Sequence, residues 1–152
     1  MSQPEKKWER SWFEIGHQLS FSICHEYDAV DREITIPLIL TFGSNQVRVK
    51  GKLDTGASSC IFPREIGEFL GIDIESGEVQ RFSSVHSSSI AYGHWLQISV
   101  FGIDFEATVY FVKEPGYPRL LLGRKGFLEK FRIGLIEYDG LLYLSEYNED
   151  QE

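Results

Sequence analysis

A single aspartate lies in a run of small residues that follows an apolar strand pattern. The run is residues 53–59, Leu-Asp-Thr-Gly-Ala-Ser-Ser, and its carboxylate belongs to Asp54. Two carboxylates held face to face share one proton, so that one acts as a base toward water while the other polarises a carbonyl. Asp-Thr-Gly occurs only once in the sequence. Chemistry of this kind would therefore take its second carboxylate from another copy of the chain.

Asp-Thr-Gly alone is a short match that also fits an ordinary strand-to-loop turn. Its context favours a catalytic loop. An alternating apolar strand precedes Asp54, small residues follow it, and Leu121-Leu122-Gly123 supplies a later apolar segment. A reactive carboxylate must be shielded from water. A second segment that threads past the loop of the carboxylate provides this shielding.

Together the two segments resemble the signatures of the retropepsin-like aspartic proteases, single-domain relatives of pepsin that work as homodimers. Residues 53–59 resemble the active-site loop of that family. Residues 121–124, Leu-Leu-Gly-Arg, resemble its second signature, which a short helix follows, here expected over 126–130. Order and spacing match from about residue 34 to 145. The resemblance implies an all-β, closed-barrel-like acid protease (retropepsin) fold with one or two short helices.

The resemblance also implies a role for each matching residue. Asp54 would be half of the catalytic dyad, and Thr55 would reach across the dimer axis and hold the two loops in register. Gly56 would let the backbone approach the substrate, and Ala57 would keep the floor of the site small and dry. Further substrate contacts would come from Ser58 and Leu122, and structural support from Leu121, Gly123 and Arg124.

Arg124 is the first departure from the family pattern. In the family this position ties the helix to the active-site loop and the dimer contact. Some relatives supply an Asp as its partner two residues after the motif glycine, where this chain has Ser58. The ion pair would then be absent or redirected to Glu129 or Glu137, which would change how firmly the dimer is held.

The flap is the second departure. Retropepsins cover their cleft with a hairpin that opens and closes over the substrate, often with a glycine-rich tip. Here the hairpin is expected over 79–95, and its tip has no glycine. Tyr92 and Trp95 either shape the cleft or pack in the core, which is commoner for aromatics on strands. The tip residues predicted to contact substrate are Val85, His86 and Ser87.

The elements that must position these residues are mostly strands. Alternating apolar residues and turn signals predict them over 34–42, 46–53, 60–62, 78–84, 89–100, 105–112, 120–122, 131–138 and 141–146. Pro63 opens a short helix over 64–70, which Gly71 ends. Asp139-Gly140 predicts the turn of the last hairpin.

The predicted organisation is one domain with two flanking segments. Residues 1–31 are an N-terminal extension, either an interface arm or a leader, in which 18–27 alternates like a strand. The protease-like domain spans 32–147, and 148–152 form an acidic tail.

Composition limits the class of protein. The 152 residues are 42% hydrophobic and 25% charged, as in one soluble globular domain. A net charge of −8 without a basic run argues against nucleic-acid binding. The first ten residues are polar, and no apolar run approaches the roughly 20 residues that span a bilayer. We therefore expect a cytoplasmic protein with no membrane contact.

Neither the cysteines nor the histidines offer a competing site. Cys24 and Cys60 are too few for a disulfide framework, so we expect reduced thiols, with one bridge as the alternative. We expect neither a metal nor an organic cofactor, because no metal-ligand spacing connects the histidines, which are His17, His25, His86 and His94.

The predicted function is that of an aspartic endopeptidase. A water activated between Asp54 and its symmetry mate would hydrolyse a peptide bound as an added strand. The resemblance alone implies apolar side chains on both sides of the cut. One alternative is a catalytically silent module of the same fold that dimerises or binds peptides. Another is a small β-barrel for an apolar ligand, which gives no reason for Leu-Leu-Gly-Arg.

Overall fold

A computed structural model of the chain describes residues 16–28, 30–31, 33–83 and 85–150. Strands dominate the described residues, together with the short helices α1 (Arg64–Phe69), η2 (Ile74–Ser76), η3 (Leu128–Lys130) and η4 (Glu137–Asp139). The strands are β1 (Ile23–Glu26), β2 (Thr35–Phe42), β3 (Asn45–Leu53), β4 (Cys60–Phe62), β5 (Glu78–Ser83), β6 (Ser88–Val100), β7 (Ile103–Val112), β8 (Leu121–Leu122), β9 (Phe131–Ile136) and β10 (Leu141–Glu146).

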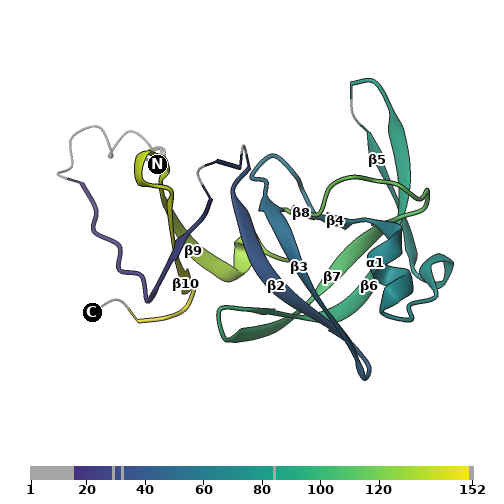
Figure 1. The fold of residues 1–152 in the computed structure, drawn as a ribbon, viewed down its shortest axis with the longest axis horizontal. Helices are drawn as coiled ribbons and strands as arrows, with labels where there is room; N and C mark the ends of the chain where they lie inside the picture. Colours follow the sequence, from purple (N-terminus) through teal and green to yellow (C-terminus); the bar gives the residue numbers. More distant parts are fainter. Residues whose placement is uncertain (1–15, 29, 32, 84, 151–152) are drawn as a thin grey trace, which may run out of the picture.

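Six of these strands close into a barrel in the order β2-β3-β8-β4-β7-β6, and β6 pairs back onto β2. Pairing with β6 uses the end of β2, from Ile39 to Thr41. The remaining strand of this sheet, β5, continues from β6 as a hairpin that projects away from the barrel (Figure 1). The all-β, closed-barrel-like fold with short helices is therefore confirmed.

Alternation along the strands explains which side chains fill the barrel. On β2, Ile36, Leu38 and Leu40 are buried, whereas Pro37 between them is exposed. Successive residues of a strand point to opposite faces, so this period of two gives the barrel an apolar interior. Pro37 precedes the stretch that pairs with β6, as expected of a proline near the beginning of a strand.

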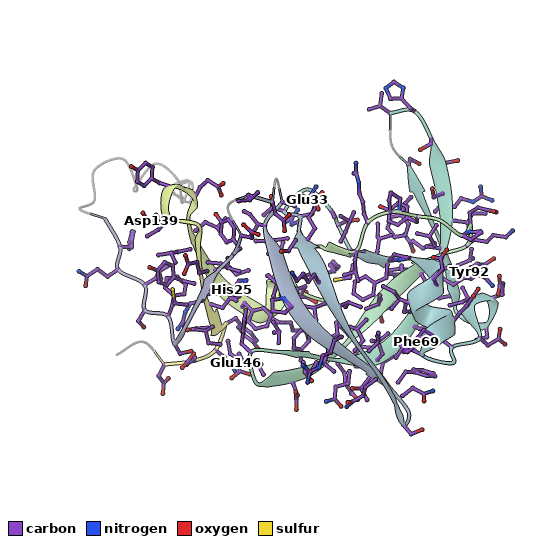
Figure 2. The ribbon with its side chains drawn as sticks, in the orientation of Figure 1. His25, Glu33, Phe69, Tyr92, Asp139 and Glu146 are labelled. Atoms are coloured by element: carbon purple, nitrogen blue, oxygen red, sulfur yellow. The ribbon has the colours of Figure 1, made fainter. Side chains whose placement is uncertain are left out.

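A smaller antiparallel sheet, β1-β10-β9, lies beside the barrel (Figure 1). Strand β1 falls in the predicted extension and pairs with β10 from Ile23 to Glu26. Figure 2 shows His25 on the barrel side of this sheet, where its Nε2 lies 3.1 Å from the Thr35 carbonyl oxygen. Residues 1–15 lie outside the described residues, and the domain boundary at 32 stays a prediction.

The helix predicted at 126–130 is wrong in extent: only the single 3-10 turn η3 forms. The reason lies in the backbone angles of the two residues that precede η3. Gly126 has φ +94°, and Phe127 has φ −134° and ψ −69°, so neither residue has helical backbone angles. The helix predicted at 64–70 is confirmed as α1, followed by Gly71 at φ +79°.

The last hairpin is confirmed with a longer turn than predicted. Ile136 pairs with Leu141, so β9 ends before Tyr138. Residues Glu137–Asp139 form the 3-10 turn η4, and Gly140 closes it in the left-handed conformation at φ +65°. That conformation favours glycine, which has no Cβ to clash.

Candidate active site

Asp54 follows directly on β3, and the barrel fixes its backbone on two sides. The Leu53 N–H donates to the Ile34 carbonyl at 2.9 Å, and the Asp54 N–H donates to the Leu122 carbonyl at 3.0 Å. Leu53 and Leu122 are also paired in the parallel β3–β8 ladder. The position of the carboxylate is therefore set by two strands of the barrel.

The turn after Asp54 holds its carboxylate. The Gly56 N–H donates to Asp54 Oδ1 at 2.9 Å, and the Ala57 N–H donates to the Asp54 carbonyl at 3.2 Å. Asp54 is half-buried, whereas Thr55 and Gly56 are exposed. A Cβ on Gly56 would lie 3.2 Å from Asp54 Oδ1, so glycine keeps this approach open.

The segment after β8 threads against the same turn, as the sequence predicts for the second signature. The Arg124 N–H donates to the Ala57 carbonyl at 2.9 Å, and the Lys125 N–H donates to the Ser58 carbonyl at 3.0 Å. An ideal Cβ at position 123 would lie 2.2 Å from the Ser59 carbonyl oxygen. Real Cβ atoms do not come so close to a backbone oxygen, so only glycine at position 123 allows the segment after β8 to cross the Asp54 turn at this distance.

A cleft of about 540 Å³ opens beside Asp54. Its walls come from the Asp54 turn, from the β5–β6 hairpin and from the loop 113–120, which arches beside the hairpin (Figure 1). The lining residues are Asp54, Gly56, Ala57, Ser58, Ile61, Phe82, Ser83, Ser87, Ser89, Ala91, Val112, Tyr117, Pro118, Arg119 and Leu121. Within the described residues, Asp54 is the only carboxylate in this lining.

Two of the leucines expected at the site exchange roles. Leu121 lines the cleft, whereas Leu122, predicted as a substrate contact, is fully buried in the core. Neighbouring residues of a strand face opposite sides, and β8 is placed by its pairing with β3 and β4. The prediction for Leu122 is therefore corrected: Leu121 takes the position beside the cleft.

The hairpin expected over 79–95 is present as β5–β6, paired from Glu78 opposite Gly93 to Ser83 opposite Ser88. Of the three predicted tip contacts, Ser87 lines the cleft. Val85, which is 94% exposed, and His86 are not among the lining residues. The structure thus places only part of the tip at the cleft.

Neither strand aromatic shapes the cleft. Tyr92 lies at the base of the hairpin, opposite Val79, and packs against the core (Figure 2). Trp95 is 60% exposed, and its Nε1–H donates to Glu106 Oε2 at 3.1 Å. Trp95 therefore fits neither the cleft nor the core interpretation.

The partners expected for Arg124 are engaged elsewhere. Glu129 Oε1 accepts the Gly126 N–H at 3.0 Å, and Glu137 accepts a short hydrogen bond from the Tyr27 hydroxyl. Over the described ranges of the chain, Arg124 forms no ion pair. Its exposed side chain lines a surface depression together with Thr55 and Ser58.

Both cysteines are free, which confirms the expectation of reduced thiols. Cys60 is fully buried on β4, next to the candidate site, with Sγ 3.7 Å from the Lys125 carbonyl oxygen. Burial raises the pKa of the Cys60 thiol to about 11. A neutral thiol is a poor nucleophile, so Cys60 is not equipped for cysteine hydrolase chemistry.

Cys24 is exposed whereas Cys60 is buried, and this difference in exposure predicts unequal reactivity of the two thiols. At pH 8, about one Cys60 thiol in a thousand is ionised, because its folded-state pKa lies some three units above the pH. We expect a disulfide reagent to titrate one thiol per native chain, the exposed Cys24. Cys60 should react only after denaturation, and Cys24→Ser should show no fast thiol at all. Two fast thiols in the native parent would contradict the burial of Cys60.

The described residues contain no cluster of three or more His, Cys, Asp or Glu that could hold a metal ion. They also contain no helix with the length and hydropathy needed to cross a membrane.

No family model matches this chain, and no curated protein matches it. Its structure is similar to the crystal structure of a retropepsin-like aspartic protease from Rickettsia conorii, with a TM-score of 0.61. The two are 23% identical, and the match covers 81% of this chain and 97% of the other. The likeness shows that this chain has a retropepsin-like fold.

Proposed function

We propose that the chain is an aspartic endopeptidase that cuts peptide bonds as a homodimer. The main support is that the barrel holds one carboxylate, Asp54, at the edge of an open cleft. The described lining of this cleft contains no second carboxylate. The counterpart of Asp54 in a second copy would complete the dyad. Two carboxylates so close cannot both ionise, and they hold one proton between them.

The reaction needs only these two groups and water. The ionised carboxylate takes a proton from water as the oxygen adds to the peptide carbonyl carbon, and the other carboxyl gives its proton to the carbonyl oxygen. In the second step the first carboxyl protonates the amide nitrogen and the C–N bond breaks. A hydroxyl of the diol returns its proton to the second carboxylate, which restores the singly protonated dyad.

Two surfaces support self-association. Thr55, Ser58 and Arg124 are exposed around the Asp54 turn, and Arg124 has no ion pair with any described residue. The outer edge of β9 pairs with no described strand, and Leu135 and Ile136 on it are 46% and 43% exposed. Exposed strand edges with apolar side chains favour pairing with another chain.

The cleft favours an extended peptide as substrate. It lies between the Asp54 turn and the β5–β6 hairpin, and β5 is the last strand of its sheet. An extended peptide can bind such a site as an added strand, with main-chain hydrogen bonds giving affinity and side-chain pockets giving specificity.

The test is a digest of a mixed peptide library from pH 4 to 7 by the parent protein and by Asp54→Asn. We expect the parent to cleave and the variant to lose at least about a thousandfold in rate, because a neutral amide can neither accept nor share the proton. The Asn side chain has nearly the same shape, so thermal unfolding should confirm that both proteins fold alike. Equal cleavage by both would overturn the proposal, as would a parent that is inactive while dimeric in sedimentation.

A catalytically silent peptide-binding or dimerisation module is the second candidate. Ser58 favours it, and so does the lack of an ion pair between Arg124 and any described residue, since the support around the turn differs from the family pattern. In the same assay this module would bind library peptides without cutting them. The cytoplasmic location stays a prediction.

A further inference from the structure

We propose that Arg119 selects substrates with an acidic side chain, Glu or Asp, next to the bond that is cut. This inference rests on the proposed peptidase function and gives it a substrate class. It replaces, for the subsite at Arg119, the apolar preference that the family resemblance implies.

The first observation is the charge pattern of the cleft. Arg119 and Asp54 are the only charged residues in its described lining, and Arg119 is the only cation. This is notable in a chain whose net charge is −8. An exposed guanidinium in the same cleft as the catalytic candidate meets any peptide that reaches Asp54.

The second observation is that the Arg119 side chain has no hydrogen-bond or ion-pair partner among the described residues. Among the described residues its guanidinium takes part in no ion pair and no side-chain hydrogen bond, although Arg64 and Lys52 elsewhere are both paired with glutamates. Arg carries several donors in a planar fork that matches a carboxylate. Those donors are left for a ligand in the cleft.

The third observation is that the backbone around Arg119 is fixed. The Leu120 carbonyl, directly after it, accepts the Lys52 N–H at 2.7 Å. Earlier in the loop, the Gly116 N–H donates to Glu65 Oε1 on α1 at 2.7 Å. Pro118 restricts the chain just before Arg119. A fixed base lets the guanidinium bind a carboxylate with less loss of freedom than a mobile loop would.

Tyr117, in the same loop, lines the cleft together with Arg119 and Asp54. Its pKa is raised, chiefly by burial; the Arg119 charge lowers it and the Asp54 charge raises it. Both charges therefore act on one phenol within the cleft. A carboxylate bound to Arg119 would lie near the reacting bond, and each copy in a dimer would bring one such subsite.

The opposite wall is compatible with this ligand. Ser83, Ser87 and Ser89 line it, and hydroxyl groups can donate hydrogen bonds to an acidic side chain or to the peptide backbone. An apolar wall would instead leave a bound carboxylate without donors, which is costly.

The test compares matched peptides that differ only by Glu or Gln beside the cut, on either side of it, at pH 6 where a glutamate side chain is ionised. For the parent we expect kcat/KM to favour Glu by about tenfold, as for a partly desolvated charge pair. Arg119→Gln should bring the ratio to about one. Arg48→Gln removes an exposed arginine from β3, outside the cleft, and should keep the parent ratio.

Binding provides a readout that does not depend on turnover. Fluorescence anisotropy would compare the same peptides on Asp54→Asn and on the double variant Asp54→Asn/Arg119→Gln. We expect Glu peptides to bind more tightly only where Arg119 is present, and added salt to reduce the difference. An unchanged Glu/Gln ratio in Arg119→Gln, by cleavage or by binding, would overturn the inference. Asp54-independent cleavage would instead refute the proposed function, and the binding arm would still decide the role of Arg119.

Discussion

A ninefold excess of Asp54→Asn chains is expected to cut the activity of each parent chain to about one tenth. If the active unit is a homodimer with one Asp54 from each copy, freely exchanging chains pair at random. At one parent chain in ten, a parent chain finds another parent chain about one time in ten. A mixed dimer has one carboxylate and one amide, so it cannot share a proton in the way the dyad does.

The measurement is the initial rate at fixed parent concentration after the chains have been mixed and allowed to exchange. Asp104→Asn is the matched control, because Asp104 is exposed and lies outside the cleft. An excess of that variant should add activity in proportion to the chains added. If exchange is shown with labelled chains and the activity per parent chain does not fall under Asp54→Asn, a shared dyad is ruled out.

Gly123→Ala is expected to produce the largest loss of stability among single methyl additions at the candidate site. The added Cβ would lie 2.2 Å from the Ser59 carbonyl oxygen and 2.8 Å from that of Ala57. Both atoms are backbone, so the Asp54 turn and the segment after β8 would have to separate. Overpacking and the loss of the hydrogen bonds at this crossing should cost about 3 kcal/mol or more.

For a chain of this size such a loss lowers the melting temperature by about 10 °C, which thermal unfolding followed by circular dichroism would detect. Gly56→Ala is the matched control on the same turn. Its Cβ would meet only the Asp54 carboxylate, at 3.2 Å, and that side chain can shift. We expect its melting temperature to stay within about 2 °C of the parent. Equal melting temperatures for both variants would show that the crossing at Gly123 is not tightly packed.

Several elements of the site are predictable from local sequence. The alternation in 46–53 identifies β3, and the small residues after it identify a turn, because strand period and turn chemistry depend on near neighbours. Gly123 is predictable as part of a second segment, and the structure supplies its reason, the approach to the Ser59 backbone.

The role proposed for Arg119 is not predictable from local sequence, because Arg119 lies in a loop marked only by proline and glycine. Its nearness to Asp54 depends on the meeting of three segments that are far apart in the chain: the Asp54 turn, the β5–β6 hairpin and the loop 113–120. The local signal for a functional role is that Arg119 is charged and directly precedes the buried run at 120–122. Such a signal does not say which surface the charge faces.

Local sequence predicts most of the strands, the β5–β6 hairpin and the carboxylate on which any acid protease chemistry would depend. Contacts between distant segments place Leu121 rather than Leu122 beside the cleft, and they bring Arg119 into the same cleft as Asp54. The physical reason is that strand patterns are set by neighbours in the chain, whereas the face of β8 is set by its pairing with β3 and β4. The charge of the cleft likewise comes from loops that closure of the barrel brings together.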